Sequence, residues 1–274
     1  MKKHFSPRLA ATLLFAAIAF TASAADWQPK VGLQTWTCRN MTFDQVVEFA
    51  VKHKIKHLEM IGNHINPGAP REELQKKKDI LDKHGLVCYT IGVAGTSTDK
   101  KKNRVLFEFA KFMGCKLIIV EPKNMAEWDN LEELVKEYDI KLAIHNHGKG
   151  TVYGDPAKVR EILAQRDKRI GVCLDVGWIT AAGFDAAKVF REYEGRVYDI
   201  HLKDKKIEKA DGKEVPIDVE VGTGDANYKG LFAELRKAKW DGVMAIETDN
   251  AGFAKEPTQF VTTAIKFAKE GAKK

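Results

Sequence analysis

Eight short apolar runs, rich in β-branched residues, alternate along the chain with eight longer stretches whose apolar residues recur at a helical spacing. The runs lie at residues 31–36, 57–62, 86–93, 116–121, 141–145, 171–175, 197–202 and 242–247. The helical stretches lie at residues 42–54, 72–83, 101–113, 130–138, 156–165, 185–193, 228–238 and 257–268. Runs that are apolar throughout are typical of parallel strands covered by helices, so the pattern predicts an α/β fold.

The number of these units favours one closed architecture. Eight strand–helix units in about 250 residues are typical of the (β/α)8 TIM barrel. A doubly wound open sheet is the alternative, but the turn after the first run, Thr37-Cys38-Arg39-Asn40, has no glycine-rich phosphate loop. No linker-like segment interrupts residues 25–274, so we expect a single barrel domain there. The long stretch at 205–224 is predicted to be an irregular functional loop.

The first 24 residues have the order of a cleavable secretory signal: three basic residues within 1–8, an apolar run at 9–20 and small residues at 21–24. The 12-residue apolar run is shorter than the roughly 20 residues that span a bilayer. Cleavage after Ala24 would leave 250 residues and lower the formal net charge from +7 to +4. We therefore expect a periplasmic or secreted protein with no nucleic-acid or membrane partner.

Ionisable side chains end six of the eight runs. In a barrel of this kind the reacting groups stand at the carboxyl ends of the strands. Carboxylates that converge there would repel one another unless a cation lay among them. The side chains at these ends are Glu59, Glu121, His145 and His147, Asp175, His201 and Lys203, and Glu247.

Four of these side chains, His145, Asp175, His201 and Glu247, are the candidate ligands of a divalent metal ion. Mixed nitrogen and oxygen ligands suit manganese, cobalt, zinc or iron(II) and would be unusual for calcium. In an extended strand His145 and His147 face the same side, so either could ligate while the other faces substrate or supports the site. The four cysteines are dispersed without a Cys-x-x-Cys pair, which argues against a zinc ribbon.

Three segments carry a resemblance to a known family: Gly-Val-Cys-Leu-Asp-Val-Gly at 171–177, His-Leu-Lys-Asp at 201–204 and Ala-Ile-Glu at 245–247. They resemble the sugar phosphate isomerase/epimerase superfamily, the xylose isomerase-like barrels that include inosose dehydratase and the endonuclease IV type. The resemblance covers the element order of residues 25–274. It implies that Asp175, His201 and Glu247 are metal ligands.

Two positions depart from the family's pattern. The epimerases have a glutamate, one of two catalytic bases, where this chain has His145. Many members have a histidine three residues after the aspartate, where this chain has Trp178. The form His145-Asn146-His147 is similar to uncharacterised isomerase-like proteins and keto-sugar lyases.

The resemblance implies proton removal next to a carbonyl, with a metal polarising the carbonyl and stabilising the enediolate. Glu247 is a candidate base, since it could both ligate and abstract. His147 or Glu121 could return the proton on the other face or expel a leaving group. Lys203 could hold or protonate a substrate oxygen; the alternative is a solvated side chain paired with Asp204.

Four further residues are candidates for substrate binding. Trp36 ends the first run and Trp178 follows the sixth, and both could stack on a sugar ring, although such residues also serve as packing. Glu59 and His64 follow the second run, and Glu59 could equally pair with a lysine. The segment Gly222-Thr223-Gly224-Asp225 lacks the lysine of a phosphate loop and is predicted to be a turn.

Export and the absence of an arginine cluster at the run ends favour a non-phosphorylated sugar, keto-sugar or keto-glycoside as substrate. The leading hypothesis is a metal-dependent sugar isomerase or epimerase. The sequence leaves the oligomeric state open, and a homodimer, common among such barrels, is one candidate. The second is a lyase, dehydratase or hydrolase of 3-keto-glycosides or inosose-like substrates, which the histidine pair favours because elimination needs a general acid. A non-catalytic sugar-binding barrel is the third. Export and the small charge argue against the fourth, an endonuclease IV-like role.

Overall fold

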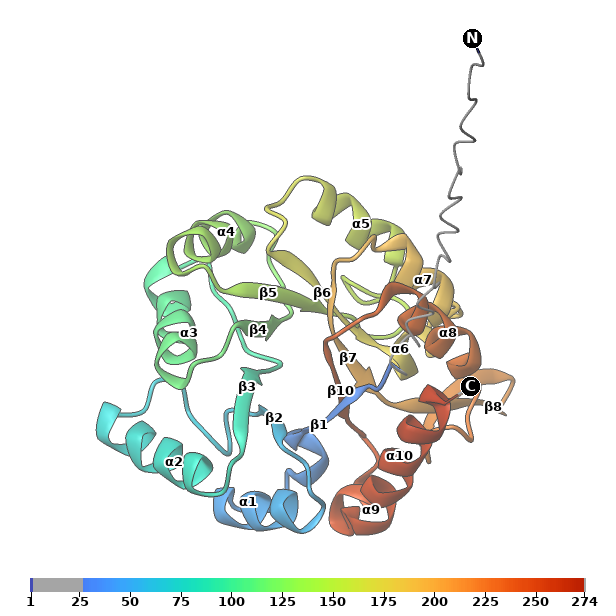
Figure 1. Cartoon of the computed structure of the whole chain (residues 1–274), viewed down its shortest axis with the longest axis horizontal. Coiled ribbons are helices and arrows are strands. Elements are labelled where there is room, and N and C mark those ends of the chain that lie inside the picture. Colours follow the sequence, from blue (N-terminus) through green and yellow to red (C-terminus); the bar gives the residue numbers. More distant parts are fainter. Residues whose placement is uncertain (2–26, 274) are drawn as a thin grey trace.

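The computed structural model describes Met1 and residues 27–273. Residues 27–273 fold into a barrel of strands surrounded by helices (Figure 1). Residues 2–24 of the predicted signal sequence lie outside the described residues, so export stays a prediction. In the described part of the chain no helix is both long and apolar enough to cross a bilayer. The four cysteines are buried and free.

Eight parallel strands form the barrel, and each falls on one of the eight predicted runs. They are β1 Lys30–Gln34, β2 His57–Met60, β3 Val87–Ile91, β4 Leu117–Val120, β5 Lys141–His145, β6 Ile170–Asp175, β7 Val197–Leu202 and β10 Val243–Ile246. They pair in the order β3-β2-β1-β10-β7-β6-β5-β4. Between β3 and β4 the backbone N–H of Ala94 donates to the carbonyl of Ile119 at 2.8 Å, which nearly closes the ring. The predicted (β/α)8 barrel is confirmed.

The outer ring of helices also follows the predicted order (Figure 1). Its members are α1 Phe43–Lys52, α2 Arg71–Lys83, α3 Lys100–Met113, α4 Glu127–Tyr138, α5 Pro156–Ala164, α7 Ala186–Glu192, α8 Tyr228–Ala238 and α10 Pro257–Ala272. Local signals set their ends: Thr42 and Asp155 accept backbone N–H groups at the starts of α1 and α5, and α3 ends at Gly114 with a φ of 82°. Three short helices follow strand ends: η1 Thr35–Cys38, α6 Val176–Ala181 and α9 Ala251–Lys255.

The prediction of an irregular loop at 205–224 is wrong. Most of that stretch is an antiparallel hairpin of β8 Asp204–Ala210 and β9 Lys213–Val219. Its turn residues Asp211 and Gly212 both have positive φ, the conformation that an Asp-Gly pair favours in a tight hairpin. After the hairpin, the carboxylate of Asp204 accepts the N–H groups of Gly222 and Gly224 at 2.9 Å, which gives the predicted turn.

The inside of the barrel is apolar on one side and polar on the other. Alternate residues of β4–β6 form a small apolar cluster apart from the main core under the helices, made of Leu117, Ile119, Ala143 and Cys173. On β2 and β7 the corresponding positions are polar although fully buried: Glu59, Asp199 and His201. Ionisable groups are costly to bury unless they are paired or bind an ion, so this side of the barrel is where function is expected.

Candidate metal centre and active site

A cavity of about 360 Å³ opens at the carboxyl ends of the strands, within the usual size range of small-ligand sites. It is lined by Gln34, Trp36, Ile61, Gly62, Asn63, Gly92, Val93, His145, His147, His201, Lys203, Glu247 and Asp249. A larger cavity of about 860 Å³ lies at the amino ends of the strands and contains none of the predicted site residues. The smaller cavity is therefore the candidate site.

Three of the four predicted metal ligands form a compact triangle beside this cavity. Nε2 of His145 lies 3.2 Å from Nδ1 of His201, and each of these atoms lies 3.5 Å from Oδ2 of Asp175. Ligand atoms bound at 2.0–2.2 Å in tetrahedral geometry stand about 3.3–3.6 Å apart, so the spacing suits a divalent ion. Oδ2 of Asp175 is buried without a hydrogen-bond partner, as expected of an atom that an ion would satisfy.

The protonation state of His145 is suited to metal binding. Burial lowers the pKa of His145 to about 4, so its imidazole is neutral near pH 7. A neutral imidazole offers a lone pair to a metal ion, whereas a protonated one does not.

Glu247, the fourth predicted ligand, stands at the edge of the triangle. Its Oε2 lies 3.7 Å from Nδ1 of His201 and also contacts the ammonium group of Lys203. Burial raises the pKa of Glu247 to about 7, which brings this carboxyl close to the range of a general base at neutral pH. Glu247 is thus placed either to complete a metal site or to exchange a proton with a substrate.

Lys203 is buried among carboxylates. Only 1% of its surface is exposed, and its Nζ lies 2.7 Å from Oδ2 of Asp249 and 3.4 Å from Oδ2 of Asp175. Burial alone would lower the pKa of Lys203, but the carboxylates of Asp175, Glu247 and Asp249 raise it well above its ordinary value. The alternative of a solvated lysine paired with Asp204 is wrong, because Asp204 binds the turn at 222–226 instead.

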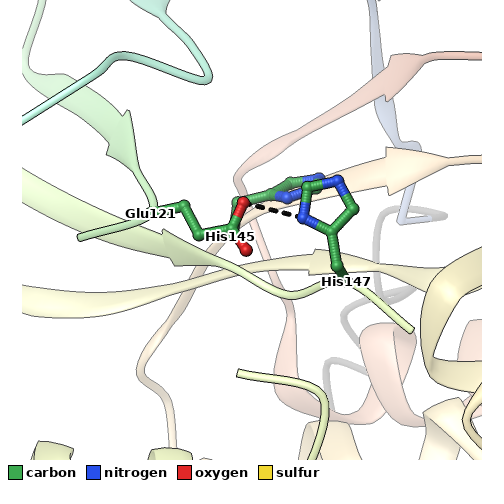
Figure 2. Close-up of side chains that lie close together, drawn as sticks. All are labelled: Glu121, His145 and His147. Atoms are coloured by element: carbon green, nitrogen blue, oxygen red, sulfur yellow. Dashed lines mark ion pairs between the residues drawn. The ribbon is translucent and has the colours of Figure 1, made fainter. Parts of the chain in front are cut away.

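Glu121 and His147 form a pair next to His145 (Figure 2). Nδ1 of His147 lies 2.7 Å from Oε2 of Glu121, and this hydrogen bond raises the pKa of His147 above its ordinary value. The ring centroids of His145 and His147 are 4.6 Å apart, so these two side chains lie on the same side of the segment. The side-chain amide of Asn146, between them in sequence, forms hydrogen bonds with the backbone of Asp175 on the neighbouring strand. The predicted alternation along this segment is confirmed. Glu121, His145 and His147 also form a second group of candidate metal ligands.

The two predicted tryptophans are placed differently. Trp36 lies in η1, beyond the end of β1, where it lines the cavity with 38% of its surface exposed and approaches Asp249. Trp178 does not line the cavity: its ring packs beside His147 and beneath the ammonium group of Lys205 at 3.8 Å. The geometry thus suits Trp36, rather than Trp178, to contact a ligand directly.

Glu59 and His64 are buried and do not line the cavity. Oε2 of Glu59 lies 3.0 Å from Nε2 of His201, so Glu59 contacts a predicted metal ligand rather than the space for a substrate. Nε2 of His64 lies 3.1 Å from the carbonyl oxygen of Met41. Substrate binding by these two residues stays a prediction, without support from their positions.

Two acidic residues were missed by the sequence reasoning. Asp249 lines the cavity and binds Lys203; its spacing of two from Glu247 was the available signal. Asp199, two residues before His201, is fully buried and accepts a hydrogen bond from the hydroxyl of Tyr89 at 2.9 Å. Burial, together with the nearby Glu59 carboxylate, raises the pKa of Asp199 well above its usual range.

Comparison with known proteins agrees with the fold. Residues 47–270 match the family model described as xylose isomerase-like TIM barrel. An inosose dehydratase of Clostridium perfringens is 27% identical over 218 residues, which cover 73% of this chain and 72% of the relative.

Solved structures share the fold. An uncharacterised protein of Parabacteroides distasonis has a TM-score of 0.69 and 26% identity, with 90% of this chain and 99% of that one covered. A structure described as IOLI protein with a binding zinc atom has a TM-score of 0.72 and 17% identity, with 89% and 98% covered.

Proposed function

Because this chain belongs to the xylose isomerase-like TIM barrel family, we propose that it is a divalent-metal-dependent enzyme that removes a proton next to the carbonyl of a small sugar. The observation that carries the proposal is the triangle of His145, Asp175 and His201 beside a sugar-sized cavity. The zinc atom named for the IOLI structure and the ligand spacing support a divalent ion. Manganese, cobalt, zinc and iron(II) all suit two imidazoles and two carboxylates.

The metal would be held by His145, Asp175 and His201, with Glu247 as the fourth ligand. When bound, such an ion polarises a carbonyl and stabilises the negative charge that develops on its oxygen. Glu247 takes the proton from carbon as the general base. Lys203 donates a hydrogen bond to a substrate oxygen at the cavity wall, and Asp249 keeps its ammonium group in place.

We favour elimination as the overall reaction, so that the enzyme is a lyase or dehydratase. His147 faces the cavity, and its hydrogen bond to Glu121 supports a proton on the ring, which it donates to the leaving oxygen. The relatives named inosose dehydratase support this choice. So does His145, which stands where the epimerases have their second carboxylate base. Isomerisation or epimerisation is the second candidate, in which His147 returns the proton to carbon instead.

The substrate is proposed to be a non-phosphorylated keto-sugar, inosose or keto-glycoside. Lys203 is the only lysine or arginine lining the described part of the cavity, and carboxylates engage it, as Glu121 engages His147, so a phosphate would find no unpaired cation there. Trp36 offers an exposed ring face for a sugar. A periplasmic location, proposed from residues 1–24 alone, would also favour such a substrate.

The test is turnover in deuterated water with an inosose and with a 3-keto-glucoside in the presence of Mn²⁺, with the ion removed by a chelating resin before the products are analysed by NMR. Elimination predicts an unsaturated product, or release of the aglycone. Isomerisation predicts deuterium at carbon without loss of a leaving group. Sugar binding with no deuterium exchange and no product would contradict the proposal and favour a non-catalytic sugar-binding barrel.

A further inference from the structure

The two ring nitrogens of His201 face different surroundings. Nδ1 points to the metal triangle, 3.2 Å from Nε2 of His145 and 3.5 Å from Oδ2 of Asp175. Nε2 points to the barrel interior, where Oε2 of Glu59 lies 3.0 Å away. His201 and Glu59 are both fully buried, so water does not compete for this contact. The ring is therefore held between the metal triangle and a single carboxylate.

The chemistry of this contact determines which nitrogen is free to bind a metal. An ionised carboxylate only accepts hydrogen bonds, so Nε2 of His201 carries the hydrogen when it bonds to Glu59. In the neutral ring Nδ1 then has a lone pair, directed at the triangle. Without Glu59 the ring could take the other tautomer, with an N–H at Nδ1 that cannot bind a metal ion.

Glu59 has few alternatives to this role. Among the described residues its one ion pair is with His201, since no lysine or arginine nitrogen lies within 4.0 Å. Its other oxygen, Oε1, is buried without a partner and packs against Gly92, where an added Cβ would lie 2.5 Å away. A fully buried carboxylate is costly unless it is paired, and a hydrophobic residue would fill this part of a core more favourably.

Asp199 is the other carboxyl group near Nε2 of His201. Its Oδ2 lies 3.9 Å away, beyond hydrogen-bond distance. Its Oδ1 instead accepts the hydroxyl hydrogen of Tyr89 at 2.9 Å. Glu59 is thus the carboxylate with the geometry to fix the ring.

We propose that Glu59 is a positioning residue, which fixes the Nε2–H tautomer of His201 and directs Nδ1 to the bound divalent ion. The proposal rests on the metal centre of the proposed function. Carboxylates that bond the second nitrogen of a metal-bound histidine orient the ring and raise its basicity, and losing one typically weakens metal affinity about 10–100-fold.

The test uses Glu59→Leu, which removes the acceptor, and Glu59→Gln, which keeps a neutral acceptor oxygen. The matched control is Glu127→Gln, a buried glutamate on α4 that bonds Thr96 and does not line the cavity. Two quantities are measured for the full-length protein: the dissociation constant of Zn²⁺ by chelator competition, and the tautomer of His201 in the Zn²⁺-loaded protein by long-range ¹H–¹⁵N NMR. The His201 signals are assigned by comparison with His201→Gln.

We expect a dissociation constant 10–100-fold higher in Glu59→Leu, a smaller increase in Glu59→Gln, and none in the control. We also expect the Nε2–H tautomer in the wild-type protein, and a loss of this preference in Glu59→Leu. If Glu59→Leu does not fold, a changed affinity or tautomer in Glu59→Gln supports the proposal.

Affinity within twofold of wild type and an unchanged tautomer in every folded Glu59 variant would overturn the role of Glu59 and leave the metal centre intact. A wild-type protein that binds no divalent ion would overturn the metal centre itself, and with it this role.

Discussion

Replacing Lys203 by methionine removes an ammonium group that contacts three carboxylates while keeping the length of the side chain. The carboxylates of Asp175 and Glu247 are nearly completely buried, whereas the Asp249 side chain is 41% exposed and solvent screens its charge. Breaking a buried ion pair by removing one partner costs about 3–5 kcal/mol. We therefore expect metal-free Lys203→Met to lose about 3 kcal/mol of unfolding free energy at pH 8, the low end of this range, because the pKa of Glu247 rises when the ammonium group that lowers it is removed.

A divalent ion should offset this loss, because it supplies positive charge to the same carboxylates. Ion at 100 times its dissociation constant stabilises a folded protein by about 2.7 kcal/mol. The variant lacks the competing ammonium group at Glu247, so its gain from the ion should exceed that of the wild-type protein at the same concentration. The loss caused by Lys203→Met should thus be larger in chelator than in saturating Mn²⁺.

The assay is urea unfolding at pH 8, followed by tryptophan fluorescence, in EDTA and in Mn²⁺. The matched control is Lys100→Met, which removes a partly exposed ion pair with Glu133. The unfolding free energy that Lys100→Met loses relative to wild type should be below about 1 kcal/mol and the same in EDTA and in Mn²⁺. A loss below about 1 kcal/mol for Lys203→Met in EDTA, or equal stabilisation of variant and wild type by Mn²⁺, would refute the reasoning.

Three further predictions concern catalysis and stability. His147→Gln should lower kcat by about 10²-fold or more in steady-state assays, and Glu121→Gln should lower it less; unchanged kcat in both variants would remove His147 as the general acid. Trp36→Ala should raise KM for the sugar with little change in kcat, and an unchanged KM would show that its ring does not contact substrate. The Arg169 guanidinium, bound to Asp167, holds the pKa of that carboxyl well below its usual range. The stabilisation that the Arg169–Asp167 pair gives is therefore present above the pKa of an aspartate in the unfolded chain, about 3.9, and is lost as the pH falls through the lower pKa of Asp167 in the folded protein. Asp167→Asn should lower the free energy of unfolding by about 1 kcal/mol at pH 7 and by less near pH 2. Urea unfolding that gives the same difference between variant and wild type at both pH values would contradict this.

The order of strands and helices could be predicted because each barrel strand is an apolar run bounded by turn residues. The hairpin was missed because its strands are rich in lysine and glutamate and face solvent, so they lack the apolar signal that marks the other eight. The available signal was the Asp211-Gly212 pair, followed by Val215, Ile217 and Val219 at alternate positions.

The site was predictable as a set of strand ends, but the depth of each side chain was not. Glu59 comes near the end of β2 and Glu247 directly follows β10, yet only Glu247 reaches the cavity. How far a side chain lies below the cavity depends on how the strands are staggered around the barrel. The spacing of residues within one strand does not reveal this stagger. The suggested pairing of Lys203 with Asp204 could have been excluded, because adjacent residues of an extended strand face opposite sides.

The most direct test of the account is the metal content of the purified protein. After incubation with Mn²⁺ or Zn²⁺ and removal of free ion, elemental analysis should find about one divalent ion per chain in the wild-type protein. His145→Ala and Asp175→Ala should lose it, while the control His84→Ala, at an exposed position on the end of α2, should retain it. Undiminished metal in both site variants, or none in the wild-type protein, would contradict a metal centre at the mouth of this barrel.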